Sequence, residues 1–163
     1  MKSSCTFLVA EDDENDVFFL QRAFKQAKVE NPLNVVRDGQ EAIEYLSGEG
    51  KFSDRNLYPL PYLFILDLKM PRKTGLEVLG WLQEQPELKC LPVLVLSSSA
   101  QRTDIERAYE LGANGFVVKP ASLEKRVELA KLMGSFWLDF NVGPLVCTEG
   151  LESARKLRKG HSG

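Results

Sequence analysis

The stretch LFILDLKMP (63–71) places four apolar residues directly before a single aspartate, Asp67, and ends at a proline. Residues 62–68 have the length and composition of a buried β-strand. A carboxylate at the end of such a strand loses hydration, and this loss needs a compensating partner. An aspartate in this place often only caps the turn that follows. Asp67 taken alone therefore leaves its role open, and the rest of the chain must decide it.

Apolar runs and amphipathic segments alternate along the chain. We expect strands at 5–10, 33–36, 62–68, 91–99 and 115–120. We expect helices at 15–28, 38–46, 75–85, 103–112 and 123–140, with Thr103 and Ser122 as N-caps of the last two. Several strands are apolar throughout, which indicates that helices cover both faces of the sheet. The pattern predicts an α/β fold with a doubly wound, five-stranded parallel sheet.

Composition excludes several classes of protein. The chain has 163 residues, enough for one domain, and a net charge of −2, which gives no general attraction to nucleic acid or anionic membranes. No apolar run is long enough to span a membrane, and acidic residues come too early for a secretory signal. The cysteines, Cys5, Cys90 and Cys147, suggest neither a zinc site nor a disulfide framework, and the single histidine, His161, excludes histidine-based sites. A reducing cytoplasm is the expected location.

Four strand ends bring polar side chains to one edge of the predicted sheet. In open α/β sheets, ligands bind beyond the carboxyl ends of the strands. These ends carry Glu11, Asp12, Asp67, Ser97 and Lys119. Clustered carboxylates repel one another unless a cation neutralises them, and an all-oxygen ligand set favours Mg²⁺ or Mn²⁺. A carboxylate beside such a metal and a lysine is suited to receive a phosphoryl group.

Each of these residues also has an ordinary structural interpretation. Lys119 alone fits a surface lysine whose stem lies along apolar surface, and Ser97 alone fits a turn hydroxyl. Asp13 either ligates the metal or starts the helix at Glu14. The group as a whole, with its members at successive strand ends in chain order, favours the chemical role.

Four segments in this order resemble the receiver domain of bacterial, CheY-like response regulators. They are FLVAEDD (7–13), ILDLKMPRKTG (65–75), LPVLVLSSSA (91–100) and GFVVKP (115–120), within a match that runs from about Thr6 to about Phe140. The resemblance implies a flavodoxin-like fold with strand order 2-1-3-4-5. It also implies a receiver domain at 4–141, followed by an extension at 142–163 that is partly helical or flexible.

The resemblance implies a role for each matching residue. Asp67 corresponds to the phospho-acceptor, and Lys119 corresponds to the lysine that pairs with the phosphate. Glu11 and Asp12 correspond to the acidic pair, with Asp12 binding Mg²⁺ directly and Glu11 binding it through water. The backbone carbonyl of Lys69 corresponds to a further metal ligand.

The resemblance also implies a conformational switch. Ser97 matches the switch hydroxyl, and Phe116 occupies the position of the switch aromatic, where tyrosine is common. Because Phe116 has no hydroxyl, its movement must be coupled by packing alone. The bond between Lys119 and Pro120 is expected to be cis. Phosphorylation is expected to shift an equilibrium that repacks the face of the fourth and fifth helices and the fifth strand.

The loop 47–61 and the segment GSFWLDFNVGP (134–144) resemble stand-alone response regulators that are paired with bacterial phytochromes. This second resemblance implies a phytochrome-type sensor histidine kinase as partner. It also implies a homodimer through the last helix and the fifth strand. In the alternative interpretation, Phe136, Trp137 and Phe140 pack the last helix on the sheet.

Other functions fit the residues less well. A phosphatase of the haloacid-dehalogenase type carries a second acid two residues after its nucleophile, where this chain has Lys69. A nucleotide-binding Rossmann protein needs GxGxxG after the first strand, where this chain has EDDEND. A receiver-fold scaffold that is never phosphorylated remains open. We expect a signalling protein that catalyses only its own phosphorylation and dephosphorylation, acts through protein contacts, and binds neither nucleic acid nor membrane.

Overall fold

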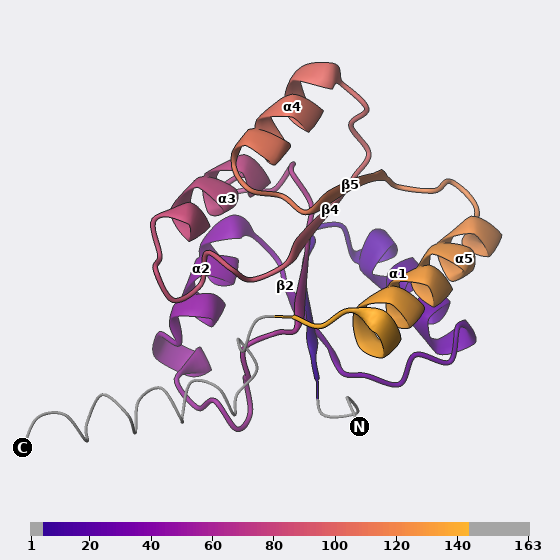
Figure 1. Ribbon diagram of the computed structural model, residues 1–163, viewed down its shortest axis with the longest axis horizontal. Coiled ribbons are helices and arrows are strands. Elements are labelled where there is room, and N and C mark those ends of the chain that lie inside the picture. Colours follow the sequence, from indigo (N-terminus) through magenta and orange to yellow (C-terminus); the bar gives the residue numbers. More distant parts are fainter. Residues whose placement is uncertain (1–4, 144–163) are drawn as a thin grey trace, which may run out of the picture.

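Five parallel strands form one sheet in the order β2-β1-β3-β4-β5 (Figure 1). The structure is a computed structural model that describes residues 5–143. The strands are β1 (Phe7–Ala10), β2 (Leu33–Val36), β3 (Leu63–Leu66), β4 (Val93–Ser97) and β5 (Gly115–Val118). Ala10 lies opposite Val36 and Leu66, so these three strands end level with one another. The expected fold class and strand order are confirmed.

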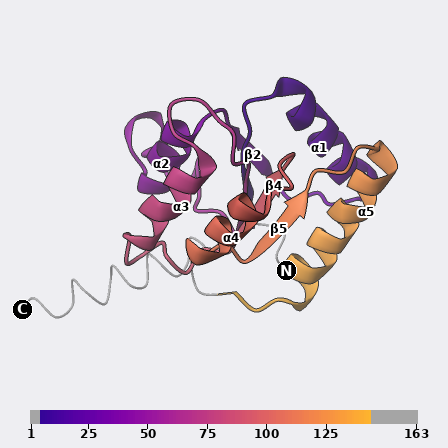
Figure 2. The same cartoon turned by 90° about the horizontal axis from the view of Figure 1, so that it is seen from above.

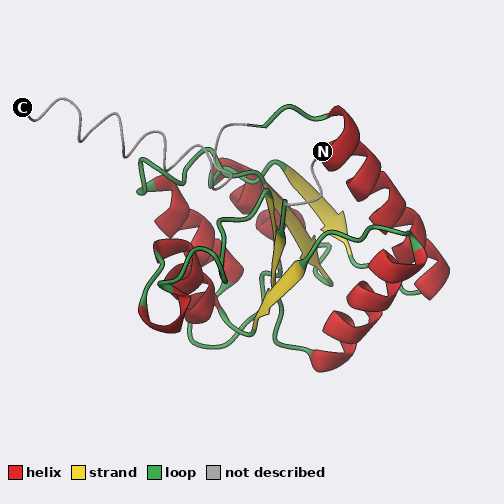
Figure 3. Cartoon of the chain, turned by 90° about the horizontal axis from the view of Figure 1, so that it is seen from below, coloured by secondary structure: helices red, strands yellow, loops and turns green. Residues whose placement is uncertain are grey.

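Helices cover both faces of the sheet. They are α1 (Glu14–Gln26), α2 (Gly39–Ser47), α3 (Gly75–Gln83), α4 (Arg102–Glu110) and α5 (Leu123–Gly134). Figures 2 and 3 show α1 and α5 side by side on one face, with α2, α3 and α4 on the other. This arrangement makes three layers with the sheet in the middle.

Two apolar cores hold these layers together, one on each face of the sheet. Alternate residues of a strand point to opposite faces, so Phe7 and Val9 belong to the core under α1 and α5. Leu8 and Ala10 belong to the core on the side of α2 and α3. All four side chains are buried. Burial on both faces explains why the strands are apolar throughout.

Side chains that cap the helix starts set where four of the helices begin. Asp13 accepts hydrogen bonds from the backbone N–H groups of Asn15 and Asp16, so of its two predicted roles it fills the helix-starting one. Asp38 caps α2 and Ser122 caps α5, the latter as predicted. Thr74 and Glu77 form a capping box at α3. The capping box at α3 orients the chain directly after the loop that contains Asp67.

The start of α4 differs from the prediction. Thr103 is not the N-cap but lies inside the helix, which follows Gln101, whose side chain makes no capping hydrogen bond. Ser99 organises this start instead. Its hydroxyl donates to Asp104 Oδ2 at 2.6 Å and accepts from the backbone N–H of Gln101 at 3.4 Å. Gly112 follows the end of α4 with a positive φ of 94°, as expected for the residue that stops a helix.

The expected last helix is divided into two parts. α5 ends at Gly134 and continues as a six-residue π-helix, η2 (Ser135–Phe140). A Cβ at Gly134 would lie 2.7 Å from Val29 Cγ2, so this glycine lets α5 approach the segment after α1. In η2, Phe136 and Phe140 are exposed and Trp137 packs partly on the core under α5. Of the three aromatics, only Trp137 therefore follows the packing interpretation.

The loop 47–61 is ordered by one arginine and a group of aromatic rings. Arg55 donates hydrogen bonds to the backbone carbonyls of Tyr45, Leu46 and Tyr58 at 2.7–3.2 Å. Two of these carbonyls lie in the last turn of α2, where carbonyls lack the N–H of a following helical turn. The rings of Tyr45, Phe52 and Tyr58 lie 5.0–5.9 Å apart between centroids. The loop is thus part of the packed domain.

Within residues 5–143, no helix combines the length and the apolarity needed to cross a membrane. The predicted extension at 142–163 lies outside the described residues from residue 144 onward. Cys147 and His161 lie there too.

Candidate functional site

The residues that follow β1, β3 and β5 meet at the carboxyl edge of the sheet. Glu11 follows β1, Asp67 follows β3 and Lys119 follows β5. The ammonium of Lys119 donates to Glu11 Oε2 at 2.6 Å and to Asp67 Oδ2 at 3.1 Å. These residues are far apart in the sequence and come together because parallel strands end at the same edge.

All three side chains are nearly excluded from solvent. The side chain of Lys119 is 9% exposed, and those of Glu11 and Asp67 are each 7% exposed. Burial alone would lower the pKa of Lys119, but hydrogen bonds with Glu11 and Asp16 and the charge of Asp67 outweigh it and raise this pKa above its usual range. Lys119 is therefore a fixed positive charge at physiological pH.

Three carboxylates at this edge are close enough to share a cation. Oxygen atoms of Glu11, Asp12 and Asp67 all lie within 4.8 Å of one another. Glu11 and Asp67 are buried and Asp12 is exposed, so the group opens to solvent on the side of Asp12. Burial, with help from the charge of Asp67, raises the pKa of Glu11 to about 7 despite its contact with Lys119. A hard divalent cation fits this oxygen set and would offset its mutual repulsion.

Asp67 is held by its own loop as well as by Lys119. Its Oδ1 accepts a hydrogen bond of 2.7 Å from the backbone N–H of Leu68. The backbone of Gly75 passes so close that a Cβ there would lie 2.2 Å from the Asp67 carbonyl oxygen. A carboxylate has about four acceptor positions, so both oxygens of Asp67 keep capacity for a further bond. Lys69 lies in this loop with an exposed side chain.

The two predicted switch residues lie on neighbouring strands. Ser97 is fully buried at the end of β4, and its Oγ accepts a 3.2 Å hydrogen bond from the backbone N–H of Ser99. Its carbonyl accepts from the backbone N–H of Lys119 at 2.8 Å, which ties β4 to the lysine. Phe116 on β5 is partly buried and packs against the core on the side of α2 and α3.

The predicted cis bond before Pro120 is wrong. The described residues contain no cis peptide bond, so the bond between Lys119 and Pro120 is trans. Trans is the lower-energy form for most bonds that precede proline.

Two residues at the site were missed by the sequence reasoning. Asp16 on α1 accepts a 2.9 Å hydrogen bond from Lys119, and Arg126 on α5 contacts Asp16. The available signal was weak: Asp16 lies one helical turn before Leu20, which is on the buried face of α1. An acid in the first turn of a helix is otherwise common because it favours the helix dipole.

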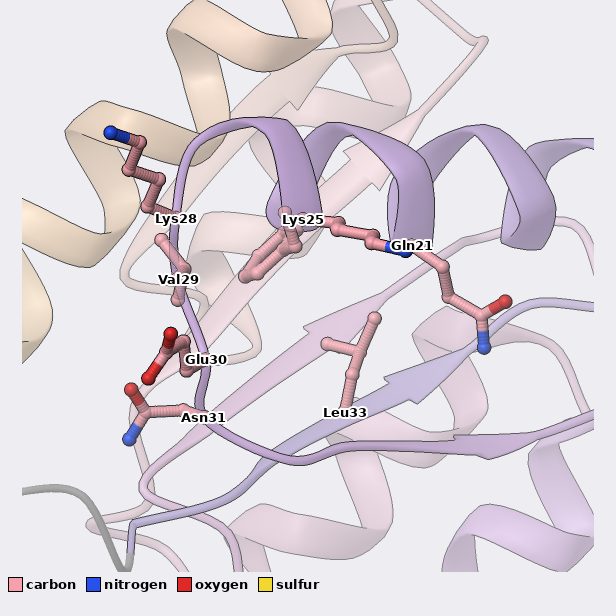
Figure 4. Close-up of a pocket in the computed structure, with 8 residues that line it drawn as sticks. Gln21, Lys25, Lys28, Val29, Glu30, Asn31 and Leu33 are labelled. Atoms are coloured by element: carbon pink, nitrogen blue, oxygen red, sulfur yellow. The ribbon is translucent and has the colours of Figure 1, made fainter.

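A hollow in the surface lies at the opposite, amino-terminal edge of the sheet. It has a volume of about 430 Å³ and lies between the end of α1 and the start of β2 (Figure 4). Its lining consists of Gln21, Phe24, Lys25, Lys28, Val29, Glu30, Asn31 and Leu33. None of the predicted site residues belongs to it, so the candidate chemistry stays at the carboxyl edge.

The fold and the acidic edge together define a doubly wound α/β protein with a cluster of carboxylates and a lysine at the carboxyl edge of its sheet. Residues 7–131 match the response regulator receiver domain family. The chain therefore belongs to the response regulator receiver domain family.

Known relatives agree with this membership over most of the chain. Response regulator Rcp1 of Synechocystis sp. is 33% identical over 132 residues, which cover 81% of this chain and 88% of Rcp1. The crystal structure of its Mn²⁺-bound form superposes with a TM-score of 0.76 at 32% identity, and covers 86% of this chain and 99% of that one.

Two further solved structures are similar. The phosphorylated cyanobacterial phytochrome response regulator RcpA gives a TM-score of 0.79 at 35% identity and covers 86% of this chain and 99% of that one. Response regulator RPA3017, in red light signalling of R. palustris, gives a TM-score of 0.82 at 35% identity, and the match covers 86% of this chain and 98% of that one.

Proposed function

We propose that this response regulator accepts a phosphoryl group on Asp67 from a phosphohistidine of a sensor histidine kinase. The observation that carries this proposal is the buried ammonium of Lys119, which bridges Glu11 and Asp67 at 2.6 Å and 3.1 Å. A lysine in this place aligns the carboxylate and faces the charge that develops on a transferring phosphoryl group. Asp67 is the acceptor because it combines this contact with two oxygens that have spare acceptor capacity.

The transfer exchanges one bond to phosphorus for another. An Asp67 carboxylate oxygen forms a bond to phosphorus, the N–P bond of the donor breaks, and the imidazole keeps the electron pair. The product is an acyl phosphate. In dephosphorylation, water attacks phosphorus and loses a proton, and the O–P bond breaks, which restores the Asp67 carboxylate and releases inorganic phosphate. The protein acts only on itself in both steps, so it is a signalling protein and not an enzyme that turns over a separate substrate.

The acidic group fits Mg²⁺ as the resident cation. Its ligands would be the carboxylates of Asp12 and Asp67, Glu11 through water, and the backbone carbonyl of Lys69. When bound, Mg²⁺ supplies positive charge that offsets the charge of the carboxylates and of the phosphoryl oxygens. The three neighbouring carboxylates and the Mn²⁺-bound form of the relative Rcp1 support this assignment.

Ser97 and Phe116 would report the phosphoryl group to the rest of the protein. The Ser97 hydroxyl would bond a phosphoryl oxygen, and Phe116 would follow by packing, since it has no hydroxyl. Their positions on β4 and β5, joined through the backbone of Lys119, support this coupling. The output surface would be the face of α4, β5 and α5.

The partner we propose is a phytochrome-type histidine kinase in the cytoplasm. Support comes from the relatives RcpA and RPA3017, which are described as a phytochrome response regulator and as a regulator in red light signalling. The protein would act through protein contacts, including a homodimer through the last helix and β5, and would bind neither nucleic acid nor membrane.

The test is Mg²⁺-dependent labelling with radioactive acetyl phosphate. We expect the wild-type protein to be labelled, the label to be lost with EDTA, and Asp67→Asn to remove it, because an amide oxygen is a poor nucleophile. Asp139→Asn is the matched control, since Asp139 is an exposed carboxylate in η2, outside the site. A label that persists in Asp67→Asn would overturn the assignment of the acceptor.

Binding of beryllofluoride, a mimic of the aspartyl phosphate, distinguishes the alternative function. A scaffold that is never phosphorylated would bind no beryllofluoride in the presence of Mg²⁺. The receiver should bind it, and Asp67→Asn should not. Fluorine NMR gives this readout without a kinase.

A further inference from the structure

One carboxylate at the phosphoryl site is shared between the site and helix α5. Asp16 accepts a hydrogen bond from Lys119 Nζ on its Oδ2 at 2.9 Å. Its other oxygen, Oδ1, accepts from both terminal nitrogens of Arg126, at 3.2 Å and 3.3 Å. The side chain of Asp16 is 26% exposed, that of Lys119 is 9% exposed and that of Arg126 is 16% exposed. Water therefore competes little for these hydrogen bonds. Asp16 thus connects the active-site lysine to α5.

Arg126 joins three parts of the fold. Its Nε donates to the carbonyl of Pro120 at 2.8 Å, which holds the segment between β5 and α5. Its guanidinium lies over the ring of Phe19 on α1, 5.6 Å from the ring centroid. Figure 2 shows α1 and α5 side by side. A change in the strength of the contact between Arg126 and Asp16 would therefore alter the position of the start of α5.

Lys119 has no hydrogen to spare. An ammonium has three N–H donors, and Lys119 uses them on Glu11, Asp16 and Asp67. A phosphoryl group on Asp67 can gain a hydrogen bond from Lys119 only if one of these contacts weakens. A small cavity of about 20 Å³, lined in part by Asp16, Asp67, Lys119 and Arg126, adjoins the cluster on the side of α1 and α5.

We propose that Asp16 competes with the phosphoryl group for Lys119, and that Arg126 sets the strength of this competition. When Lys119 turns toward a phosphoryl oxygen, Asp16 is left to Arg126, and the contact between α1 and α5 tightens. Asp16 and Arg126 are positioning residues for Lys119. This inference rests on the proposed function of Asp67 as the phosphoryl acceptor.

The coupling is reciprocal, because two sites linked through one equilibrium affect each other equally. Arg126→Gln removes the alternative partner of Asp16, so Asp16 holds Lys119 more firmly and beryllofluoride binds more weakly. Asp16→Asn removes the competing charge, so beryllofluoride binds more tightly. We expect each change to be about fivefold in the dissociation constant, the lower range of measured couplings.

A double-mutant cycle separates this coupling from general electrostatics. Affinity for beryllofluoride at saturating Mg²⁺ is measured for wild type, Asp16→Asn, Arg126→Gln and the double variant. If Arg126 acts through Asp16, the effect of Arg126→Gln disappears in the Asp16→Asn background. If it acts only as a nearby positive charge, the effect persists there, and additive free energies overturn the proposal.

Two further measurements complete the design. Arg22→Gln removes an exposed arginine from α1 and should leave the affinity unchanged. The NMR signal of the Arg126 Nε–H group should shift on binding of beryllofluoride in the wild type and shift less in Asp16→Asn. An unshifted Arg126 signal in the wild type would overturn the proposal.

These outcomes are distinct from failure of the proposed function. Absence of beryllofluoride binding in the wild type would contradict Asp67 as acceptor. Binding that needs Asp67 but shows an additive cycle would contradict only the role of Asp16 and Arg126.

Discussion

At the scale of single residues, Glu11 is the most unusual ionisable group of the site. Its side chain is 7% exposed and lies beside both Asp67 and Lys119. Burial raises its pKa to about 7 from an ordinary value of 4.5, because desolvation outweighs the attraction of Lys119. The folded protein therefore binds a proton at Glu11 more tightly than the unfolded chain does.

This shift predicts a pH dependence of stability in the absence of metal. Between about pH 4.5 and pH 7 the folded state keeps the proton that the unfolded state has lost, so stability falls as pH rises through this window. At about 1.4 kcal/mol per pKa unit, the loss is on the order of 3 kcal/mol above pH 7. Urea unfolding in EDTA, compared between wild type and Glu11→Gln across this range, measures it.

The variant and the metal provide the controls. As pH rises, the unfolding free energy of the wild type should fall relative to that of Glu11→Gln. Saturating Mg²⁺ should reduce this movement, because a bound cation favours the ionised form of Glu11. Parallel profiles for the two proteins in EDTA would contradict the raised pKa.

At the scale of elements, the connection from β3 to α3 fixes the backbone of Asp67. The backbone N–H of Gly75 donates to the carbonyl of Leu68 at 2.9 Å, and the capping box of Thr74 starts α3 at Gly75. A Cβ on Gly75 would lie 2.2 Å from the Asp67 carbonyl oxygen and 2.8 Å from Leu68 Cα. Both contacts are with backbone atoms, which cannot rotate away as a side chain can. Glycine is therefore required here because there is no room for a Cβ, and not because of an unusual φ angle.

Two glycines of α3 make a matched pair for testing this connection. Gly75→Ala should lower the free energy of unfolding by about 1–3 kcal/mol through overpacking, and should also reduce labelling of Asp67. Gly80→Ala meets only Leu111 Cδ2 at 4.0 Å, and should raise stability by about 0.5–1 kcal/mol. Urea unfolding together with acetyl phosphate labelling measures both effects. Equal stability of the two variants would contradict the close approach at Gly75.

At the scale of the whole molecule, apolar side chains remain exposed around the end of the last helix and on β5. Leu132 is 62% exposed, Phe136 53%, Phe140 76% and Val118 46%. Exposed apolar side chains of this kind are a common component of interfaces. They support the proposed homodimer, which would bury part of this area.

Sedimentation equilibrium tests this assembly. We expect the wild-type protein to form dimers, and Leu132→Glu and Phe136→Glu to shift it to monomers, because a buried unpaired carboxylate is costly. Leu57→Glu is the control, since Leu57 is 69% exposed in the loop 47–61. If the wild type is monomeric throughout, or if Leu57→Glu has the same effect as the other two variants, the proposed interface is wrong.

The sequence by itself determined the fold class and the meeting of Glu11, Asp67 and Lys119. It could do so because β-strands have a simple apolar pattern and parallel strands end at a common edge, so position in a strand predicts position in space. Helix boundaries such as the start of α4 were predicted less well, because capping depends on local hydrogen bonds, here those of Ser99.

Only the tertiary structure revealed the contacts that link Lys119, Asp16 and Arg126. Their contact depends on how α1 and α5 pack side by side on one face of the sheet, with each helix turned so that the two side chains meet. Helical periodicity tells which face of each helix is buried, but it does not tell which residues of two distant helices face each other. The close approach of Gly134 to Val29 was likewise hidden from the sequence, because the two residues belong to distant parts of the chain.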